Sequence, residues 1–207
     1  MRAVCISKST GAISKIGAFL SLGEVVATPT ETAYGLLADS TNTKAVARVV
    51  KIKGREPGKP IALMAADLKM VCKYFLLASG ELRLANKFWP GPLTLLLKPK
   101  RKFPAAVVGP GGLIGVRVPG DVWLRTLIIA VGKPLTATSA NRAGARTPYS
   151  ARAVQRALAA RGLTHLVDAG RLRLRPTSTV VRVRGQSVAV VRPGAVSERR
   201  LQRALGV

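Results

Sequence analysis

Hydrophobic and polar positions along the chain follow two periods, which predict a mixture of helices and strands. Spacings of three and four residues, as at Ile13, Ile16 and Leu20, are typical of helices with one buried face, whereas short runs rich in β-branched residues are typical of strands. Helices are predicted over residues 10–22, 43–52, 67–77, 80–88, 121–131 and 150–160, and from Ser197 as an N-cap onward. Strands are predicted over residues 24–28, 60–65, 93–97, 113–118, 135–138, 165–167, 179–183 and 188–191, with Pro29 ending the first.

The order of these elements indicates the fold class. Strands and helices are interleaved without a strict βαβ repeat, which favours an α/β fold with a mixed sheet. Neither an internal repeat nor an interdomain linker divides the 207 residues. We therefore expect one domain over residues 1–207.

Basic residues greatly outnumber acidic ones, and this balance excludes several kinds of site. The chain has 34 Lys and Arg, 9 Asp and Glu and a single histidine, giving a formal charge of +25. The nine scattered carboxylates leave few candidates for a two-metal site, and one histidine cannot build a His-rich metal centre. A histidine-dependent triad would have to use His165.

The C-terminal part of the chain is the more basic, with 14 of the 21 arginines at or after Arg142. In the alternating segment 171–175, an extended backbone would place Arg171, Arg173 and Arg175 on one face. Such a face suits phosphate, because each guanidinium offers a planar pair of donors. The alternative interpretation is a solvated, arginine-rich surface.

Cys5 and Cys72 are the only cysteines and form no CxxC pair. We expect both to be reduced and mostly buried, as is usual for free cysteines. No apolar run reaches the roughly 18 residues of a membrane span. These features predict a cytoplasmic protein with no membrane contact.

Four short segments concentrate polar, basic or rigid residues at the ends of predicted elements. Residues 29–36 (PTETAYGL) carry hydroxyl, carboxylate and phenol groups that suit a small polar ligand, and residues 51–55 (KIKGR) place cations around a glycine. Residues 89–94 (WPGPLT) form a rigid turn, and residues 138–141 (TSAN) offer hydroxyl and amide groups to a phosphate or ribose. Each segment taken alone has an ordinary structural explanation, such as favourable charge at a helix C-terminus for KIKGR.

Together and in this order, the segments resemble the YrdC-like threonylcarbamoyl-AMP synthase family. The KxR pattern of that family stands here at residues 53–55 and its SxN pattern at residues 139–141, and GVRVP, STVV and RPG match at residues 115–119, 178–181 and 192–194. The resemblance covers residues 23 to 194, approximately. It implies the short, single-domain form of the family, with a twisted mixed, largely parallel sheet and a positively charged concave face.

The resemblance also implies an activity. A nucleotidyltransferase of this family makes L-threonylcarbamoyladenylate and pyrophosphate from L-threonine, bicarbonate and ATP with Mg²⁺. The product supplies the threonylcarbamoyladenosine modification of tRNA, so tRNA or other RNA and downstream threonylcarbamoyl-transfer proteins are expected partners. Attack on phosphorus demands positioning and neutralisation of phosphate charge, which a site rich in Lys and Arg provides.

The resemblance assigns roles residue by residue. The expected catalytic residues are Lys53 and Arg55, the expected threonine-binding residues are Thr32, Arg117, Ala137 and Ser178, and the expected nucleotide-binding residues are Arg55, Lys59, Ser139, Asn141, Thr147 and Arg192. No residue of the chain is expected to ligate a metal.

Three departures from the family pattern stand beside these assignments. Some relatives have a histidine where this chain reads Ile-Ala-Leu-Met at residues 61–64, a common threonine is replaced near Leu113, and Arg182 replaces an aspartate. The alternative function is a non-catalytic RNA-binding or ribosome-associated protein of the same fold. A carbamoyl-transfer role, as in a hydrogenase-maturation protein with a related domain, is disfavoured because acylphosphatase-like and zinc-finger-like sequences are missing.

Overall fold

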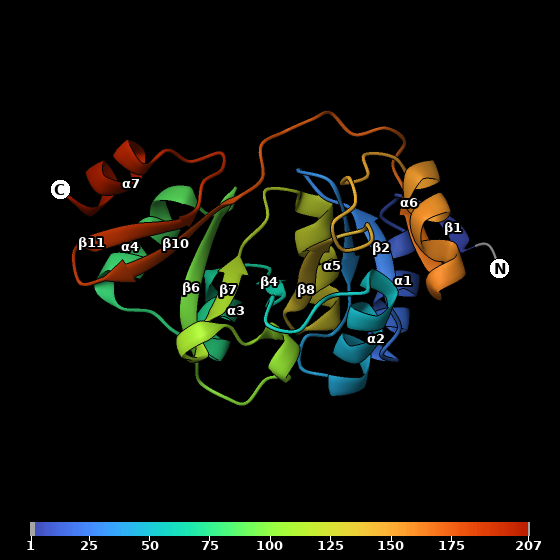
Figure 1. Ribbon diagram of the computed structural model, residues 1–207, viewed down its shortest axis with the longest axis horizontal. Coiled ribbons are helices and arrows are strands. Elements are labelled where there is room, and N and C mark those ends of the chain that lie inside the picture. The colour runs from blue at the N-terminus through green and yellow to red at the C-terminus, as the bar shows by residue number, and fades with distance from the viewer. Residues whose placement is uncertain (1–2, 207) are drawn as a thin grey trace.

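The computed structural model describes residues 3–206, and its helices flank an extended sheet (Figure 1). The strands are β1 (Val4–Ser7), β2 (Val26–Pro29), β3 (Tyr34–Leu37), β4 (Ala62–Met64), β5 (Phe75–Leu76), β6 (Leu93–Pro99), β7 (Ile114–Arg117), β8 (Leu135–Ser139), β9 (His165–Asp168), β10 (Thr179–Arg184) and β11 (Ser187–Arg192). The α-helices are α1 (Ala12–Ser21), α2 (Thr43–Lys53), α3 (Leu68–Tyr74), α4 (Ser79–Phe88), α5 (Val122–Val131), α6 (Ala151–Leu158) and α7 (Glu198–Leu205). Three short 3₁₀ turns are η1 (Ala105–Val107), η2 (Pro110–Gly112) and η3 (Ala159–Arg161).

The strands join in the order β1-β9-β2-β3-β8-β4-β7-β6-β10-β11, and β5 pairs with β6. The pairs β1–β9, β2–β9, β4–β7 and β6–β10 are parallel, and the other pairs are antiparallel. In Figure 1, β1 and α6 lie at one end of the molecule, and β10, β11, α4 and α7 lie at the other. The expected α/β domain with a mixed sheet and flanking helices is confirmed, although the expected largely parallel sheet has four parallel and six antiparallel strand pairs.

Two buried clusters hold the helices on the sheet. The smaller lies where α1 contacts α5 and includes the fully buried side chains of Ile16, Leu20 and Leu127. The larger gathers apolar side chains from α2, α4, α6 and α7 against the remaining strands. Each fully buried Leu or Ile stabilises the fold by about 1.5–3 kcal/mol. The two clusters therefore hold the helices and strands in fixed positions, and the ends of the strands with them.

Helix α2 shows how the sequence places a site residue. The Asn42 side chain accepts hydrogen bonds from the backbone N–H groups of Lys44 and Ala45, which starts the helix. Gly54 ends the helix in the left-handed region at φ 62°, which favours glycine. Lys53 is therefore the last helical residue, with its side chain directed into the protein.

The sequence patterns missed three strands, β1, β3 and β5. Strand β3 overlaps the segment predicted to bind a ligand, and all four of its residues are buried between β2 and β8. The strand ends at Pro29 as predicted, with Pro29 itself as the last residue of β2 and paired with Tyr34. A proline at a strand end costs no ladder hydrogen bond in the strand interior, which explains this position.

Three smaller predictions are corrected. Both cysteines are free as expected but exposed instead of buried, since Cys5 lies on the edge strand β1 and Cys72 on the outer side of α3. Ser197 occupies the N-cap position of α7, but its side chain makes no capping hydrogen bond. Residues 171–175, where Arg171, Arg173 and Arg175 were expected on one face of an extended segment, form no regular strand, and Arg171 makes an isolated β-bridge with Ser150.

Among residues 3–206, no helix is both long enough and apolar enough to cross a membrane.

Candidate active site

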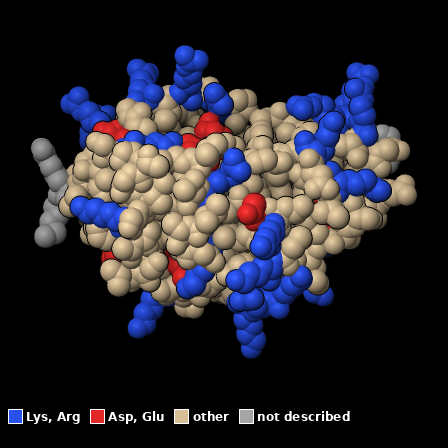
Figure 2. Space-filling model, turned by 180° about the vertical axis from the view of Figure 1, so that it is seen from behind, with Lys and Arg blue, Asp and Glu red and all other residues tan. Residues whose placement is uncertain are grey.

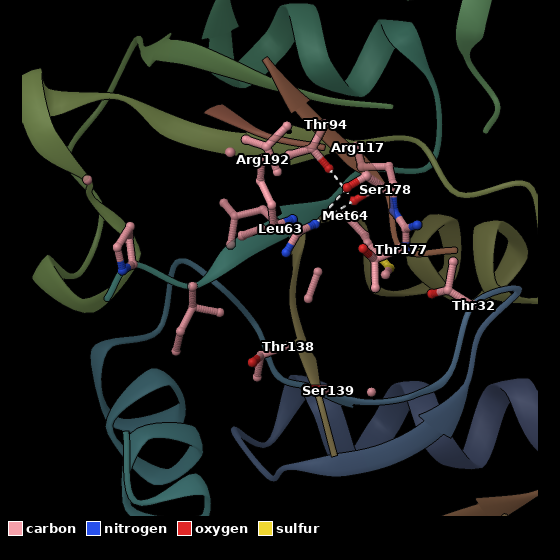
Figure 3. Close-up of a pocket in the computed structure, with 18 of the residues that line it drawn as sticks. Thr32, Leu63, Met64, Thr94, Arg117, Thr138, Ser139, Thr177, Ser178 and Arg192 are labelled. Carbon is pink, nitrogen blue, oxygen red and sulfur yellow. Dashed lines mark hydrogen bonds between the residues drawn. The ribbon is translucent and has the colours of Figure 1, made fainter. Parts of the chain in front are cut away.

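A cavity of about 610 Å³ lies where strands from both halves of the chain meet (Figure 3). Strands β3 and β8 contribute to one side of it, and β4, β6, β7, β10 and β11 contribute to the other. Its volume falls within the range of about 300–1,000 Å³ that is typical of small-molecule sites. Most of the residues assigned by resemblance line this cavity: Thr32, Lys53, Arg55, Arg117, Ala137, Ser139, Thr147, Ser178 and Arg192.

The Lys53 ammonium holds the turn that follows β8. Its Nζ donates to the backbone oxygen of Ser139 at 2.6 Å, to Asn141 Oδ1 at 3.1 Å and to the Asn141 backbone oxygen at 3.3 Å, and lies 3.3 Å from Ser139 Oγ. Burial and, to a smaller extent, the charge of Arg55 lower the pKa of Lys53 to about 8. The SxN segment thus depends on a lysine contributed by the KxR segment.

Arg55 lies at the opposite side of the same turn. Its guanidinium donates to the backbone oxygens of Lys59 and Pro60 and to Thr138 Oγ1 at 3.3 Å, which fixes the planar group at the cavity wall. Burial lowers the pKa of this guanidinium from its ordinary value, yet the group remains a cation. The loop over residues 56–60 is therefore tied to the arginine through its backbone.

Arg117, at the end of β7, is buried, and only part of the hydrogen-bonding capacity of its guanidinium is used. Its Nη1 lies 3.1 Å from Glu31 Oε1, and Glu31 Oε1 also faces the Gly120 N–H at 3.4 Å. Burial lowers the pKa of Arg117, while the Glu31 carboxylate opposes that shift. A guanidinium has five N–H donors, so most of those of Arg117 are available to an anion in the cavity.

Ser178 connects two sides of the cavity. Its Oγ lies 2.9 Å from Thr94 Oγ1, and Arg192 Nη2 donates to Ser178 Oγ at 3.1 Å and to the Ser178 backbone oxygen at 2.8 Å (Figure 3). Thr94 comes from β6 and Arg192 from the last residue of β11, so hydrogen bonds tie three distant segments together. Burial also lowers the pKa of Arg192.

The turn after β2 presents Thr32 to the cavity. The Thr30 hydroxyl donates to the Ala33 backbone oxygen at 2.7 Å, and Thr30 Oγ1 accepts the backbone N–H groups of Thr32 and Ala33. Thr32 Oγ1 lies 3.0 Å from Thr30 Oγ1, a hydrogen bond in which either hydroxyl can be the donor. These contacts hold the Thr32 side chain at the cavity wall.

Two residues assigned to the nucleotide do not line the cavity. Lys59 is exposed and pairs with Glu56 at 2.7 Å on the surface. Asn141 is buried beside the cavity, where its side chain bridges Lys53 and the Ala145 backbone oxygen. Asn141 thus shapes the turn that carries Ser139.

Sequence reasoning also missed several residues of the cavity wall. Thr94 lies within the WPGPLT segment, whose role was read as a rigid turn, and its position at the start of a strand was the available signal. Apolar side chains occupy the place of the histidine found in some relatives, with Ile61, Leu63 and Met64 in the wall. Arg182, by contrast, lies on β10 outside the lining, so the charge change there is separated from the cavity.

The chemistry of the lining is that of an anion site. Among the described residues that line the cavity, three arginines and one lysine occur without any Asp, Glu, His or Cys. The described residues also contain no group of three or more such side chains that could hold a metal ion. Hydroxyl groups complete the polar lining, so the cavity can bind and orient carboxylate and phosphate groups.

Comparisons with known proteins agree with this geometry. The Sua5/YciO/YrdC family model, described as "Telomere recombination", matches residues 18–194. The threonylcarbamoyl-AMP synthase of Bacillus subtilis is 32% identical over 97% of this chain and 58% of its own length, and that of Thiobacillus denitrificans is 33% identical over 82% of this chain and 90% of its own length.

A solved structure extends the likeness to three dimensions. Sua5 of Pyrococcus abyssi, determined in complex with L-threonine, superposes with a TM-score of 0.90 at 29% identity, covering 99% of this chain and 61% of that protein. The chain thus spans less than two thirds of the B. subtilis and P. abyssi proteins. With its motifs in order around one cavity and a family model that matches most of its length, the chain belongs to the Sua5/YciO/YrdC family.

Proposed function

We propose that the protein is a threonylcarbamoyl-AMP synthase, an enzyme that makes L-threonylcarbamoyladenylate, pyrophosphate and water from L-threonine, bicarbonate and ATP. The observation that carries this proposal is one cavity whose described lining combines Arg55, Arg117 and Arg192 with hydroxyl groups and contains no carboxylate. Relatives at 32% and 33% identity are named as synthases of this kind, and the P. abyssi relative binds L-threonine. The non-catalytic RNA-binding alternative is not favoured by these names.

The cavity offers separate places for the two larger substrates. The unused donors of Arg117 suit the threonine carboxylate, and Ser178, Thr32 and the backbone at Ala137 surround the same region. Arg55 and Arg192 suit phosphate oxygens, with Ser139 and Thr147 beside them. With the substrates bound in this way, the threonine amine and the α-phosphorus would share one cavity, where proximity contributes to the rate.

The reaction then needs two bond-forming steps. The threonine amine captures the carbon of bicarbonate, releasing water and giving a carbamate. A carbamate oxygen attacks the α-phosphorus of ATP, and pyrophosphate leaves with the bond electrons. Arg55 and Arg192 neutralise charge that develops on the phosphate oxygens. Because the AMP group passes from ATP to the carbamate, the enzyme is a nucleotidyltransferase.

Mg²⁺ enters as part of the ATP substrate. Mg²⁺ is usually held by one or two carboxylates together with substrate phosphates, but the described lining of this cavity has no carboxylate. The residues therefore fit a metal that is carried by the triphosphate and water, with Thr and Ser hydroxyls as the neighbouring protein oxygens. The metal would neutralise charge on the pyrophosphate that leaves.

The adenylate is a reactive intermediate, so we expect downstream threonylcarbamoyl-transfer proteins to deliver its acyl group to tRNA. The decisive experiment measures pyrophosphate release by the purified protein with Mg²⁺ and ATP, with threonine or bicarbonate omitted in turn. Release that requires both substrates supports the proposal, and Arg117→Ala should abolish this threonine-dependent release. Release that is independent of threonine would overturn it.

A further inference from the structure

The charge of the whole protein favours multivalent anions over free threonine. Lys and Arg side chains project all around the face shown in Figure 2, with few Asp and Glu side chains between them, and the formal charge is +25. Such a charge raises the concentration of phosphate and pyrophosphate near the surface. Threonine at neutral pH is a zwitterion without net charge, so the protein does not attract it in this way. Selective binding of its carboxylate therefore requires a local feature that rejects phosphate.

Glu31 distinguishes Arg117 from the other two arginines of the cavity. Glu31 Oε1 lies 3.1 Å from Arg117 Nη1, and the Arg117 and Glu31 side chains are 7% and 16% exposed. Arg55 and Arg192 make no salt bridge among residues 3–206, and their guanidinium groups donate to backbone and hydroxyl oxygens. Both therefore present an uncompensated positive charge to a ligand, whereas a carboxylate offsets the charge of Arg117.

The Glu31 carboxylate is held beside Arg117 and is not part of the described cavity lining. Thr30 Oγ1 accepts the Thr32 N–H at 3.1 Å and so fixes the turn that carries Glu31. The Gly120 N–H lies 3.4 Å from Glu31 Oε1, and Glu31 Oε2 is buried without a hydrogen-bond partner among the described residues. A buried carboxylate oxygen without a donor is costly, which indicates a role other than stability.

A second arginine makes this end of the cavity attractive to phosphate. In Figure 3, Arg117 and Arg192 both point toward the region of Ser178, and Arg192 Nη2 donates to Ser178 Oγ at 3.1 Å. Burial is the main cause of the lowered pKa of Arg117, but the charge of Arg192 also contributes, so the two guanidinium groups interact. Two neighbouring guanidinium groups suit a phosphate dianion. Without a carboxylate beside them, they would bind phosphate or the pyrophosphate product.

We infer that Glu31 is a specificity-determining residue that acts through Arg117 and keeps phosphate away from it, an inference that rests on the proposed binding of the threonine carboxylate by Arg117. The Arg117–Glu31 pair has no net charge but still offers N–H donors to the cavity, which suits recognition by directional hydrogen bonds. The repulsion between Glu31 and a ligand grows with the charge of the ligand, so it is about twice as large for a dianion as for a carboxylate. The ammonium group of threonine offsets the repulsion further.

The test separates the charge of Glu31 from its shape. Glu31→Gln removes the charge but keeps an oxygen that can accept from Arg117, and Glu31→Asp keeps the charge on a shorter side chain. Glu24→Gln is the matched control, because Glu24 pairs with Arg48 at 2.6 Å away from the cavity lining. Isothermal titration calorimetry measures the affinity of each protein for inorganic phosphate and for L-threonine, separately and in competition, without ATP and at a pH where phosphate is a dianion.

We expect Glu31→Gln to gain a phosphate site that threonine displaces, with the affinity for phosphate relative to threonine raised by about tenfold or more. Adding Arg117→Ala should remove this site. Glu31→Asp should reject phosphate as the wild type does, even if its affinity for threonine falls. A variant with a merely disrupted turn would lose threonine binding without gaining this phosphate site.

Phosphate binding that is equal in the wild type and Glu31→Gln would overturn the inference, as would an equal gain in the control Glu24→Gln. Either result leaves threonine binding by the wild type, and with it the proposed function, untouched. Failure of the wild type to bind threonine would instead count against the proposed function. The phosphate titrations would then still show whether Glu31 sets the affinity of Arg117 for phosphate, so the two failures are distinguishable.

Discussion

Replacing Lys53 by methionine tests whether this buried ammonium supports the Ser139–Asn141 turn. The substitution keeps most of the volume but leaves the Asn141 backbone oxygen and Asn141 Oδ1 without their donor, whereas the Ser139 backbone oxygen still accepts the Asn141 N–H at 2.9 Å. A buried acceptor left unpaired costs about 1–3 kcal/mol, so two of them give about 4 kcal/mol. The variant also removes a buried charge, whose unfavourable burial is reflected in the pKa of about 8 and amounts to about 3 kcal/mol. The expected net loss of stability at pH 7 is therefore about 1 kcal/mol.

The pH dependence of this loss has a definite sign. The pKa of Lys53 is about 8 in the folded protein and near its ordinary value of 10.5 in the unfolded chain. Between these values the unfolded chain binds more protons, so the stability contributed by Lys53 rises with pH. The advantage of the wild type over Lys53→Met should grow by up to about 3 kcal/mol from pH 8 to pH 10.5.

Urea denaturation at several pH values measures both quantities. Lys51→Met is the matched control, because Lys51 lies in the same last turn of α2 but is exposed. Both variants lose one cation near the helix C-terminus, so the helix-dipole contribution cancels in the comparison. If Lys53→Met is as stable as Lys51→Met at pH 7, and the difference stays constant with pH, the reasoning about Lys53 is wrong.

Three further predictions concern the cavity. Arg117→Lys should raise the KM for threonine at least tenfold in initial-rate assays, because lysine cannot offer two parallel donors, and an unchanged KM would argue against a carboxylate at this position. Thr94→Val removes a hydrogen bond to the serine that also contacts Arg192, so KM should rise for both threonine and ATP, and a rise for only one substrate would show that the two regions are not linked. Gly194→Ala places a Cβ against the Thr177 backbone oxygen and should lower the urea midpoint by the equivalent of about 3 kcal/mol, whereas Gly120→Ala, which meets open space, should not.

Much of the fold could be predicted from local sequence, because the signals for helix ends are local. Asn42, Asp67 and Asp121 cap α2, α3 and α5 through their own side chains, and the glycines after α2 and α5 adopt the left-handed conformation. Strand β3 escaped prediction because its residues were interpreted as a ligand segment. The pairing of β1 with β9 joins residues more than 150 positions apart, and no local pattern encodes it.

The sequence motifs predicted which residues form the candidate site. They did not predict the contacts that these residues make with one another. Lys53 and Arg55 stand in one short pattern, yet Lys53 contacts oxygens 86 and 88 residues away, which only the folded chain reveals. The same holds for Arg117 and Glu31, whose ion pair spans 86 residues. The sequence motifs therefore indicate which side chains are candidates for binding or catalysis. The tertiary structure decides which of these side chains face a ligand and which hold a neighbouring segment in place.

The order of the strands has a consequence for how the protein is made. Arg192 ends β11, the last strand, and its hydrogen bonds to Ser178 complete the wall of a cavity whose first residues are Thr30 and Thr32. Edge strand β1 likewise cannot pair until β9, which lies far along the chain, has been synthesised. A nascent chain on the ribosome therefore has no complete binding cavity until residue 192 has emerged, so the ability to hold its ligands appears late and all at once during synthesis.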